Sequence, residues 1–461
     1  MNNAHALLFS LLFLIRPIGH TQTIEWQKNL GGSEDEVATA IAQTSDGYIV
    51  AGYTESNDHD VSGHHGDNDY WVVKLNAAGN IQWQKCLGGS ADDIAYAIIQ
   101  TSDGGYVVAG STGSNNGDVS GNHGTYDYWV VKLSATGNMQ WQKCLGGSSS
   151  DHAYSLARTA DGGYVVAGAS MSNDGDVSGN HGDYDDWVVK LDATGTIQWQ
   201  KSLGGDEEDI AYSIVQTNDG SYLVAGLSHS DNGDVITNHG GDDYWVVKLN
   251  SSGDVQWQKS LGGSGYEEAH AVVQASDGGY IVAGYTESKD GDVTGNHSGP
   301  YGTTYDEWVV KLDAGGAIQW QKCLGGRDDE EANAMARTAN GGYIIAGASE
   351  SDDGDATANY GNGDFWIVKL AGNGTFVENG HHEETVSIYP NPTKGKIHIQ
   401  LAPAPRKTYD IAFINSTGQT IFNIRSQSDV IEIDRDRWPS GVYTIKITTE
   451  GSVYTRKLLL K

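Results

Sequence analysis

Asp, Asn and Ser side chains recur at a fixed spacing in a polar loop that the chain carries in several copies. One copy has Asp174, Asp176 and Ser178, then a glycine, and a closing Asp185 at the twelfth position. Oxygen atoms at positions 1, 3 and 5, a glycine at 6 and a carboxylate at 12 are the ligand set that a twelve-residue loop offers to Ca²⁺. The spacing therefore predicts Ca²⁺ binding in at least one of these loops.

Four copies keep the candidate metal ligands. These are Asp58, Asp60, Ser62 and Asp69; Asn116, Asp118, Ser120 and Asp127; Asp174, Asp176, Ser178 and Asp185; and Asp290, Asp292, Thr294 and Asp306. The other two copies depart from the pattern, one at Ile236 and Thr237 and the other at Ala358. The alternative is a turn without a metal, because Asn, Asp and Gly also stabilise polar turns unaided.

Histidine and cysteine recur with the same repeat. The histidines are His65, His123, His181, His239 and His297, and the cysteines are Cys86, Cys144 and Cys323. Because equivalent residues lie a whole repeat apart, we expect neither a shared metal ion nor a disulfide. We interpret the histidines as surface or turn-stabilising residues and the cysteines as free thiols.

Short strands must position these loops. Residues 95–101, 106–110, 128–133 and 139–143 are rich in β-branched and aromatic residues and are separated by turns or loops that contain glycine. They predict four strands in a meander. Trp129 of this unit recurs at spacings of 58 residues or, once, 63, as Trp71, Trp187, Trp245, Trp308 and Trp366. A period of this length with four strands per repeat predicts an all-β chain folded as a β-propeller.

The ends of the repeat array set the expected number of blades. Six copies of the first three strands are present, and residues 24–30 supply a lone fourth strand before the first copy. We therefore predict a six-bladed β-propeller over residues 23–376, with four-stranded blades and the N-terminal strand closing the last blade. The alternative is an open β-solenoid with an unpaired first strand. Closure is favoured because it removes exposed sheet edges.

The hairpin over residues 130–143 carries a Gly-containing turn before Trp141. In this it resembles the repeat of quinoprotein-type propellers. The resemblance implies the propeller fold, but no set of unlike residues stands out that could hold a quinone cofactor.

The two ends of the chain differ from the repeats. Residues 1–22 resemble a secretory signal peptide, with an apolar run over residues 6–15 that is too short to span a bilayer. The chain holds 28 Lys and Arg and 60 Asp and Glu; 11 and 6 of these lie in residues 385–461, which leaves 17 and 54 before them. This change of charge predicts a linker at residues 377–384 and a separate C-terminal domain. The acidic body argues against nucleic acid and anionic membranes as partners, and no stretch predicts a transmembrane anchor in the mature chain.

Ordered motifs mark the last 77 residues, 385–461. They read SIYPNPTKG at 387–395, NSTGQ at 415–419, WPSGVY at 438–443 and YTRKL at 454–458. This set resembles the C-terminal sorting domain (type A) of the type IX secretion system of Bacteroidetes. The resemblance implies Sec export, passage through the type IX machinery, removal of the tag, and release or attachment at the outer-membrane surface. Short strand-like runs predict a small Ig-like β-sandwich here. An Ig-like binding module without a sorting role is the alternative.

These observations favour a secreted or surface-displayed propeller that acts as a binding or interaction module for a glycan or an extracellular protein, with Ca²⁺ ordering its loops. Near-identical repeats favour binding over catalysis, because a catalytic pocket needs unlike groups. The alternative is a polysaccharide-active hydrolase, a glycoside hydrolase of the endoglucanase kind, whose two carboxylates we would seek at residues 267–268 and 328–331. A purely structural surface protein is a third reading. The sequence assigns no catalytic residue.

Overall fold

The computed structural model describes residues 26–297, 304–339, 341–356 and 359–371, and in the C-terminal part 387–389, 396–400, 409–415, 419–426, 428, 430–433, 438–439, 441–449 and 452–460. The chain divides into two compact units, Met1–Gly372 and Asn373–Lys461. The expected signal peptide, the expected linker and most of the insertion after His297 lie outside the described residues.

The first unit is a series of antiparallel sheets in which strands pair in chain order. The first strands are β1 (Glu36–Thr44), β5 (Asp93–Gln100), β9 (Asp151–Arg158), β13 (Asp209–Gln216), β17 (Glu267–Gln274) and β21 (Glu330–Arg337). The second strands are β2 (Gly47–Thr54), β6 (Tyr106–Thr112), β10 (Tyr164–Ser170), β14 (Tyr222–Ser228), β18 (Tyr280–Thr286) and β22 (Tyr343–Ser349). The third strands are β3 (Asp69–Asn76), β7 (Asp127–Leu133), β11 (Asp185–Leu191), β15 (Asp243–Leu249), β19 (Asp306–Leu312) and β23 (Asp364–Leu370). The fourth strands are β4 (Ile81–Leu87), β8 (Met139–Leu145), β12 (Ile197–Leu203), β16 (Val255–Leu261) and β20 (Ile318–Leu324).

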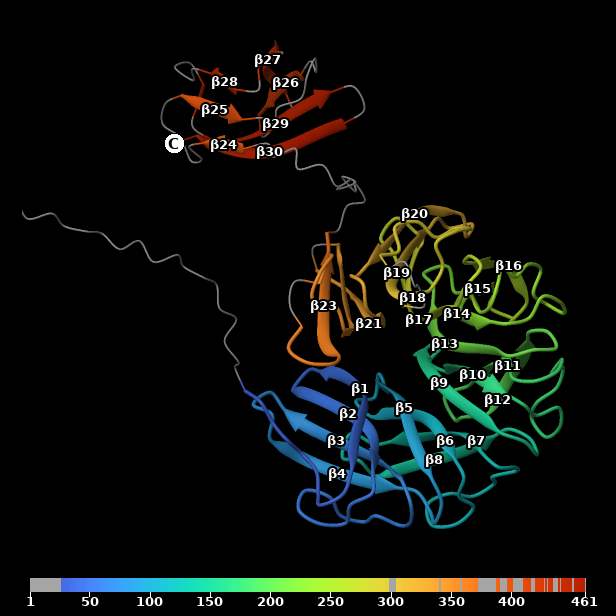
Figure 1. Cartoon of the computed structure of the whole chain (residues 1–461). Helices are drawn as coiled ribbons and strands as arrows, with labels where there is room; N and C mark the ends of the chain where they lie inside the picture. Colours follow the sequence, from blue (N-terminus) through green and yellow to red (C-terminus); the bar gives the residue numbers. More distant parts are fainter. Residues whose placement is uncertain are drawn as a thin grey trace, which may run out of the picture. The chain divides into compact units, whose positions relative to one another are not determined.

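The first strands of successive sheets contact one another from β1 to β21, so they line the centre of the unit (Figure 1). This arrangement confirms the predicted all-β repeat of four-stranded blades. It places the N-terminal ends of the first strands beside the long loops that join second and third strands.

Aromatic side chains hold neighbouring sheets together. The ring of Tyr128 packs on Trp187 of the next sheet with centroids 4.6 Å apart, and its hydroxyl donates to the Trp187 carbonyl at 2.9 Å. In the fourth strand, Trp83 lies on the glycine turn of the following sheet and its indole nitrogen donates to the Ala135 carbonyl at 3.2 Å. These contacts between sheets explain why both tryptophan positions recur along the sequence.

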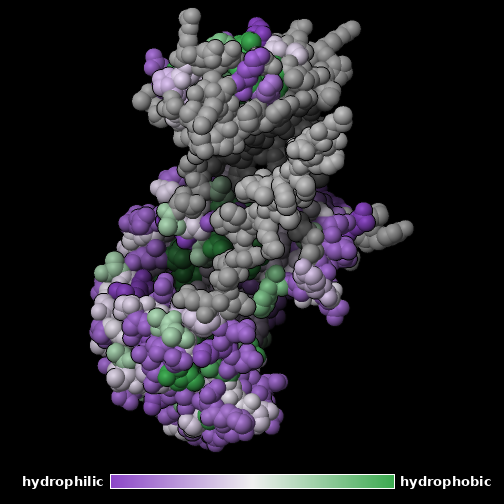
Figure 2. Space-filling model, turned by 90° about the vertical axis from the view of Figure 1, so that its left-hand side faces the viewer, coloured by the Kyte–Doolittle hydropathy of each residue, from purple (hydrophilic) through white to green (hydrophobic). Residues whose placement is uncertain are grey.

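The last sheet differs from the others. It has only three strands, β21, β22 and β23, and residues 26–30 pair with no strand in the described part of the chain. Phe365 of β23 is 96% exposed and Ile41 of β1 is 68% exposed, whereas the equivalent Tyr128 and Ile98 are 0% and 6% exposed. Figure 2 shows hydrophobic surface on the side where β23 and the first sheet lie. The expected closure of the last blade by the N-terminal strand is therefore not formed here, and the blade number stays a prediction.

The second unit has two small sheets, β24-β25-β28 and β27-β26-β29-β30. Its strands are β24 (Ser387–Tyr389), β25 (Ile397–Gln400), β26 (Tyr409–Ile414), β27 (Thr420–Ser426), β28 (Val430–Ile433), β29 (Gly441–Thr449) and β30 (Ser452–Leu460). Ile399, Ile411, Phe413 and Ile445 belong to one buried apolar cluster. The alternating apolar residues of these strands thus make the core of a β-sandwich, as the sequence predicted.

Candidate functional site

The first and fifth positions of the long loops bind neighbouring protein groups. Asp174 Oδ1 accepts the Ser148 amide at 2.7 Å, and Ser178 Oγ accepts the Gln200 side-chain amide at 2.5 Å. The same contacts recur for Asp58, Asn116 and Asp290 at the first position, and for Ser62, Ser120 and Thr294 at the fifth. These oxygen atoms, expected as calcium ligands, already accept hydrogen bonds from the protein.

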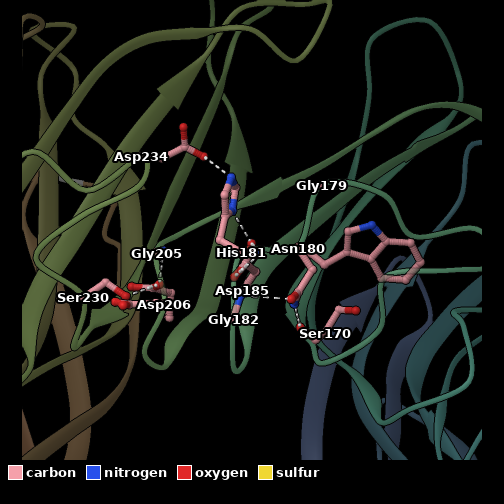
Figure 3. Close-up of polar contacts among 12 residues, drawn as sticks. Ser170, Gly179, Asn180, His181, Gly182, Asp185, Gly205, Asp206, Ser230 and Asp234 are labelled. Atoms are coloured by element: carbon pink, nitrogen blue, oxygen red, sulfur yellow. Dashed lines mark hydrogen bonds and ion pairs between the residues drawn. The ribbon is translucent and has the colours of Figure 1, made fainter.

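The closing aspartate of each of the first five long loops is buried and binds the loop histidine. Asp185 Oδ2 lies 2.7 Å from His181 Nδ1, and His181 Nε2 lies 3.9 Å from Asp234 of the next sheet (Figure 3). Asp69, Asp127, Asp243 and Asp306 bind their own loop histidines in the same way. The histidines therefore stabilise the loops.

The third-position acids are Asp60, Asp118, Asp176 and Asp292. Asp60 accepts the Gly31 amide at 3.4 Å, and Asp118 lies 4.0 Å from His65 Nε2. Within the described ranges, no group of three or more His, Cys, Asp or Glu residues is arranged to hold a metal ion. Calcium binding by these loops stays a prediction.

A second carboxylate lies beside each of these five closing aspartates. At the junction of the third and fourth sheets, a side chain at Gly204 would meet Asp209 at 2.5 Å and Asp185 at 3.1 Å, so only glycine leaves room there. Burial raises the pKa of Asp185 to about 6 against the hydrogen bonds from His181, and the charge of Asp209 adds to the rise. The equivalent pairs are Asp69 with Asp93, Asp127 with Asp151, Asp243 with Glu267, and Asp306 with Glu330. The junctions between sheets thus carry buried acidic pairs.

The first strand of every sheet in the first unit contains a β-bulge. The residues left without a partner in the second strand are Thr39, Tyr96, Tyr154, Tyr212, His270 and Asn333. A glycine of the second strand permits each bulge: a Cβ on Gly226 would lie 1.8 Å from the Ile210 carbonyl oxygen. Bulges redirect side chains and are common next to functional sites.

Four of the bulge residues form a continuous set of ring contacts. The ring centroids lie 5.3 Å apart for Tyr96 and Tyr154, 5.5 Å for Tyr154 and Tyr212, and 5.1 Å for Tyr212 and His270. Tyr285 of β18 extends the set, 5.8 Å from His270. We call these five residues the aromatic arc. All are half-buried, and burial raises the pKa values of Tyr154 and Tyr212, which keeps their hydroxyls protonated.

Carboxylates lie at the His270 end of the aromatic arc. Glu268 accepts the Tyr285 hydroxyl and lies 3.3 Å from His270 Nε2. Burial alone would raise the pKa of Glu268, but the hydrogen bonds from His270 and Tyr285 outweigh it and lower that pKa. Burial raises the pKa of Glu331, with a further rise from the charge of Glu268 and an opposing effect of His270. The pKa values of two carboxyls that influence each other are thus shifted in opposite directions.

Sequence reasoning did not find the aromatic arc. Glu267, which it grouped with Glu268, is fully buried and binds the Thr286 hydroxyl at 2.6 Å and the Gly263 amide at 2.9 Å. The available signal was variation within a near-identical repeat, because the bulge position holds Thr, Tyr, His or Asn while its neighbours stay almost constant. A residue's position within the repeat, more than its type, decides whether its side chain is used in packing, as in Glu267, or is free to contact a ligand, as at the bulge.

The C-terminal unit can be compared with a known family. Residues 387–461 match the family model of the secretion system C-terminal sorting domain. This part of the chain is a sorting domain. This confirms the type IX resemblance, so the protein is secreted or displayed at the cell surface and its C-terminal unit addresses the secretion machinery. The described residues contain no helix that is long and apolar enough to cross a bilayer.

Similarity to individual proteins is partial. Regulatory protein FlaEY of Caulobacter vibrioides is 29% identical over 240 residues, which are 48% of this chain and 25% of that protein. PorZ, a surface component of the type IX secretion system of Porphyromonas gingivalis, has 11% identity and a TM-score of 0.34 over 95% of this chain and 61% of its own. The extracellular domain of BT4673 from B. thetaiotaomicron has 10% identity and a TM-score of 0.34 over 92% and 57%. The chain therefore spans a quarter of the length of the curated relative and under two thirds of each of these structures.

Proposed function

We propose that the protein is an extracellular binding module whose aromatic arc contacts a glycan or a protein. The observation that carries this proposal is the bulge, which brings Thr, Tyr, His or Asn from otherwise near-identical sheets to the strands that line one centre. Tyrosine rings offer apolar faces together with hydroxyls, and half-buried carboxylates offer acceptors, which is the mixture that orients a polar ligand. At most other positions of the repeat, the same residue type recurs from sheet to sheet.

The test is binding of the full mature chain to arrays of glycans and extracellular proteins. Tyr212→Ala, and separately Tyr154→Ala, should weaken the strongest interaction at least about tenfold, the effect of losing about 1.4 kcal/mol. Tyr360→Ala is the matched control, because Tyr360 is 91% exposed on the last long loop and lies outside the aromatic arc. Unchanged binding in both arc variants would contradict the proposal.

A second candidate function is glycoside hydrolysis at Glu268 and Glu331. Support comes from the opposite directions of their pKa shifts, because such catalysis needs two carboxyls whose environments move their pKa values apart. Glu268 would act as nucleophile or base and Glu331 as acid. Glu268→Gln should abolish turnover of a polysaccharide substrate while the exposed Glu207→Gln retains it. Equal activity in the two variants would refute this assignment.

We also propose Ca²⁺ as a ligand of the long loops, on the strength of the repeated spacing. Binding would require Asp174 and Ser178 to exchange protein donors for the ion. Chelated protein should then gain thermal stability at millimolar Ca²⁺, and Asp174→Asn combined with Asp176→Asn should reduce the gain.

A further inference from the structure

The second residue of the third strand separates two kinds of junction between sheets. Tyr70, Tyr128 and Tyr244 each pack on the tryptophan of the next sheet and donate to its carbonyl at 2.9 Å. The third and fifth sheets have Asp186 and Glu307 at this position instead. At those two junctions a carboxylate replaces the phenol ring.

Both replacements leave buried oxygen atoms without a partner. Asp186 is 1% exposed and Glu307 is 0% exposed, and none of their four carboxyl oxygens has a hydrogen-bond partner. Aspartate is much shorter than tyrosine, so Asp186 cannot take over the contact that a tyrosine hydroxyl makes with the next sheet. A buried carboxylate without a partner costs several kcal/mol unless something neutralises it.

The surroundings of these carboxyls are acidic. The carboxylates of Asp209 and Asp185 lie close enough to Asp186 to act on its charge, and the carboxylate of Glu330 does the same for Glu307, where Lys322 opposes it. A positive charge at either site would offset this concentration of carboxylates.

A groove lies near the first of these sites. A groove of about 460 Å³ between the third and fourth sheets is lined by His181, Ser202, Leu203 and Asp234, among others. Leu203 pairs directly with Asp186 across β11 and β12. The groove thus reaches β12, the strand next to the one that carries the unpaired carboxylate.

We propose that Asp186 and Glu307 each mark a buried site for a hard divalent cation between adjacent sheets. The oxygen donors would be the unpaired carboxyl, the first-strand acid beside it (Asp209 or Glu330), and the carbonyl of the next sheet's tryptophan. Such all-oxygen surroundings suit Ca²⁺ rather than transition metals. These sites are separate from the long loops, and the ion would join the two pairs of sheets that lack the tyrosine contact.

The test uses Ca²⁺ as the probe on the full chain after chelation, with bound Ca²⁺ counted by equilibrium dialysis. Asp186→Tyr and Glu307→Tyr should each lower the number of bound ions by one, and the double variant should lower it by two, whatever number the long loops hold. Tyrosine occupies this position in three other sheets, so the variants should fold, and their melting temperatures in the absence of Ca²⁺ report this. Glu207→Gln is the matched control, because this exposed acid belongs to neither proposed kind of site, and the variant should bind as many ions as the wild type.

Two results would overturn the inference. If the wild-type chain binds no Ca²⁺ and its melting temperature does not change, the carboxyls hold protons instead. If the double tyrosine variant keeps the wild-type stoichiometry, the ions lie elsewhere, and loss in the Asp174 and Asp176 variant would place them in the long loops. Tb³⁺ emission sensitised by the adjacent tryptophans gives an independent readout, and should fall in the Asp186→Tyr variant.

Discussion

At the scale of single residues, the chain combines two opposite kinds of aspartate. Burial raises the pKa values of Asp93, Asp127 and Asp243 to about 6 against the hydrogen bonds that each accepts. On the turns at the other end of the strands, hydrogen bonds from Thr101 and Lys132 lower the pKa of Asp103 to about 2. Aspartates of the first group hold their protons more tightly in the folded chain than in the unfolded chain. Asp103 holds its proton less tightly in the folded chain.

These shifts predict the pH dependence of stability. Between about pH 4 and 6 the folded chain keeps protons that the unfolded chain has lost, so stability falls as pH rises through this window. Below about pH 4, aspartates of the Asp103 kind lose their contribution as pH falls. In chelator, the melting temperature should therefore be several degrees higher at pH 5 than at pH 8.

The matched variant for this prediction is Asp93→Asn, which removes one titrating group. It should reduce the difference in melting temperature between pH 5 and pH 8. A melting temperature that increases from pH 5 to pH 8 would show that the buried acids are already compensated in the folded state.

At the scale of elements, the bulge and its facing glycine act as one device. Every first strand bulges at the same position, and the facing glycines approach the carbonyl oxygen of the first strand closely. The device keeps the sheet intact while presenting one side chain per blade towards its neighbours. The aromatic arc therefore depends on backbone geometry as much as on its tyrosines.

Gly226→Ala tests this dependence. The new Cβ would meet the Ile210 carbonyl at 1.8 Å, so the bulged strand must move, and we expect a loss of about 2–4 kcal/mol in unfolding free energy. Gly361→Ala is the control, because no atom lies within 4 Å of its Cβ position, and should change stability by less than about 0.5 kcal/mol. Chemical denaturation of the two variants measures the difference. Equal stabilities would mean that the bulge is not fixed by this glycine.

The elements also show how far the sequence predicts the molecule. The run at 128–133 forms β7, as predicted. The periodic tryptophans make contacts between sheets, and the C-terminal motifs belong to a sorting domain. The bulges were not predicted, because a glycine in an apolar strand gives no indication of which carbonyl it faces. The long loops were ambiguous for a physical reason: Asp174 and Ser178 have the same oxygen atoms whether they accept amide hydrogens or bind an ion. The Asp186 substitution is visible in the repeat, but its burial without a hydrogen-bond partner depends on how neighbouring sheets pack.

At the scale of the whole first unit, one junction is incomplete. Trp26 already donates to the Ala77 carbonyl at 3.0 Å, as Trp83 donates to Ala135 in the next sheet, so the N-terminal segment lies on the first sheet as a fourth strand would. The three-stranded last sheet lacks such a strand, and Phe365 and Ile367 are exposed where the equivalent residues of other blades are buried. Covering each such apolar side chain contributes about 1.5–3 kcal/mol. We therefore predict that β23 pairs with residues 26–30 in solution and closes the ring.

The register of that closure follows from the first blade. There Val72 pairs with Lys85, and the equivalent residues are Ile367 and Lys28. Cysteines at Lys28 and Ile367, with the three native cysteines replaced by serine, should form an intramolecular disulfide. Closing a loop of about 340 residues should stabilise the fold by roughly 5 kcal/mol. Cysteines at Lys28 and Lys369, two residues out of register, should cross-link poorly. A disulfide between two chains would instead mean that a second copy covers the exposed face. Antiparallel partners in a formed sheet lie within disulfide reach. The absence of a cross-link in both pairs would therefore establish an open array.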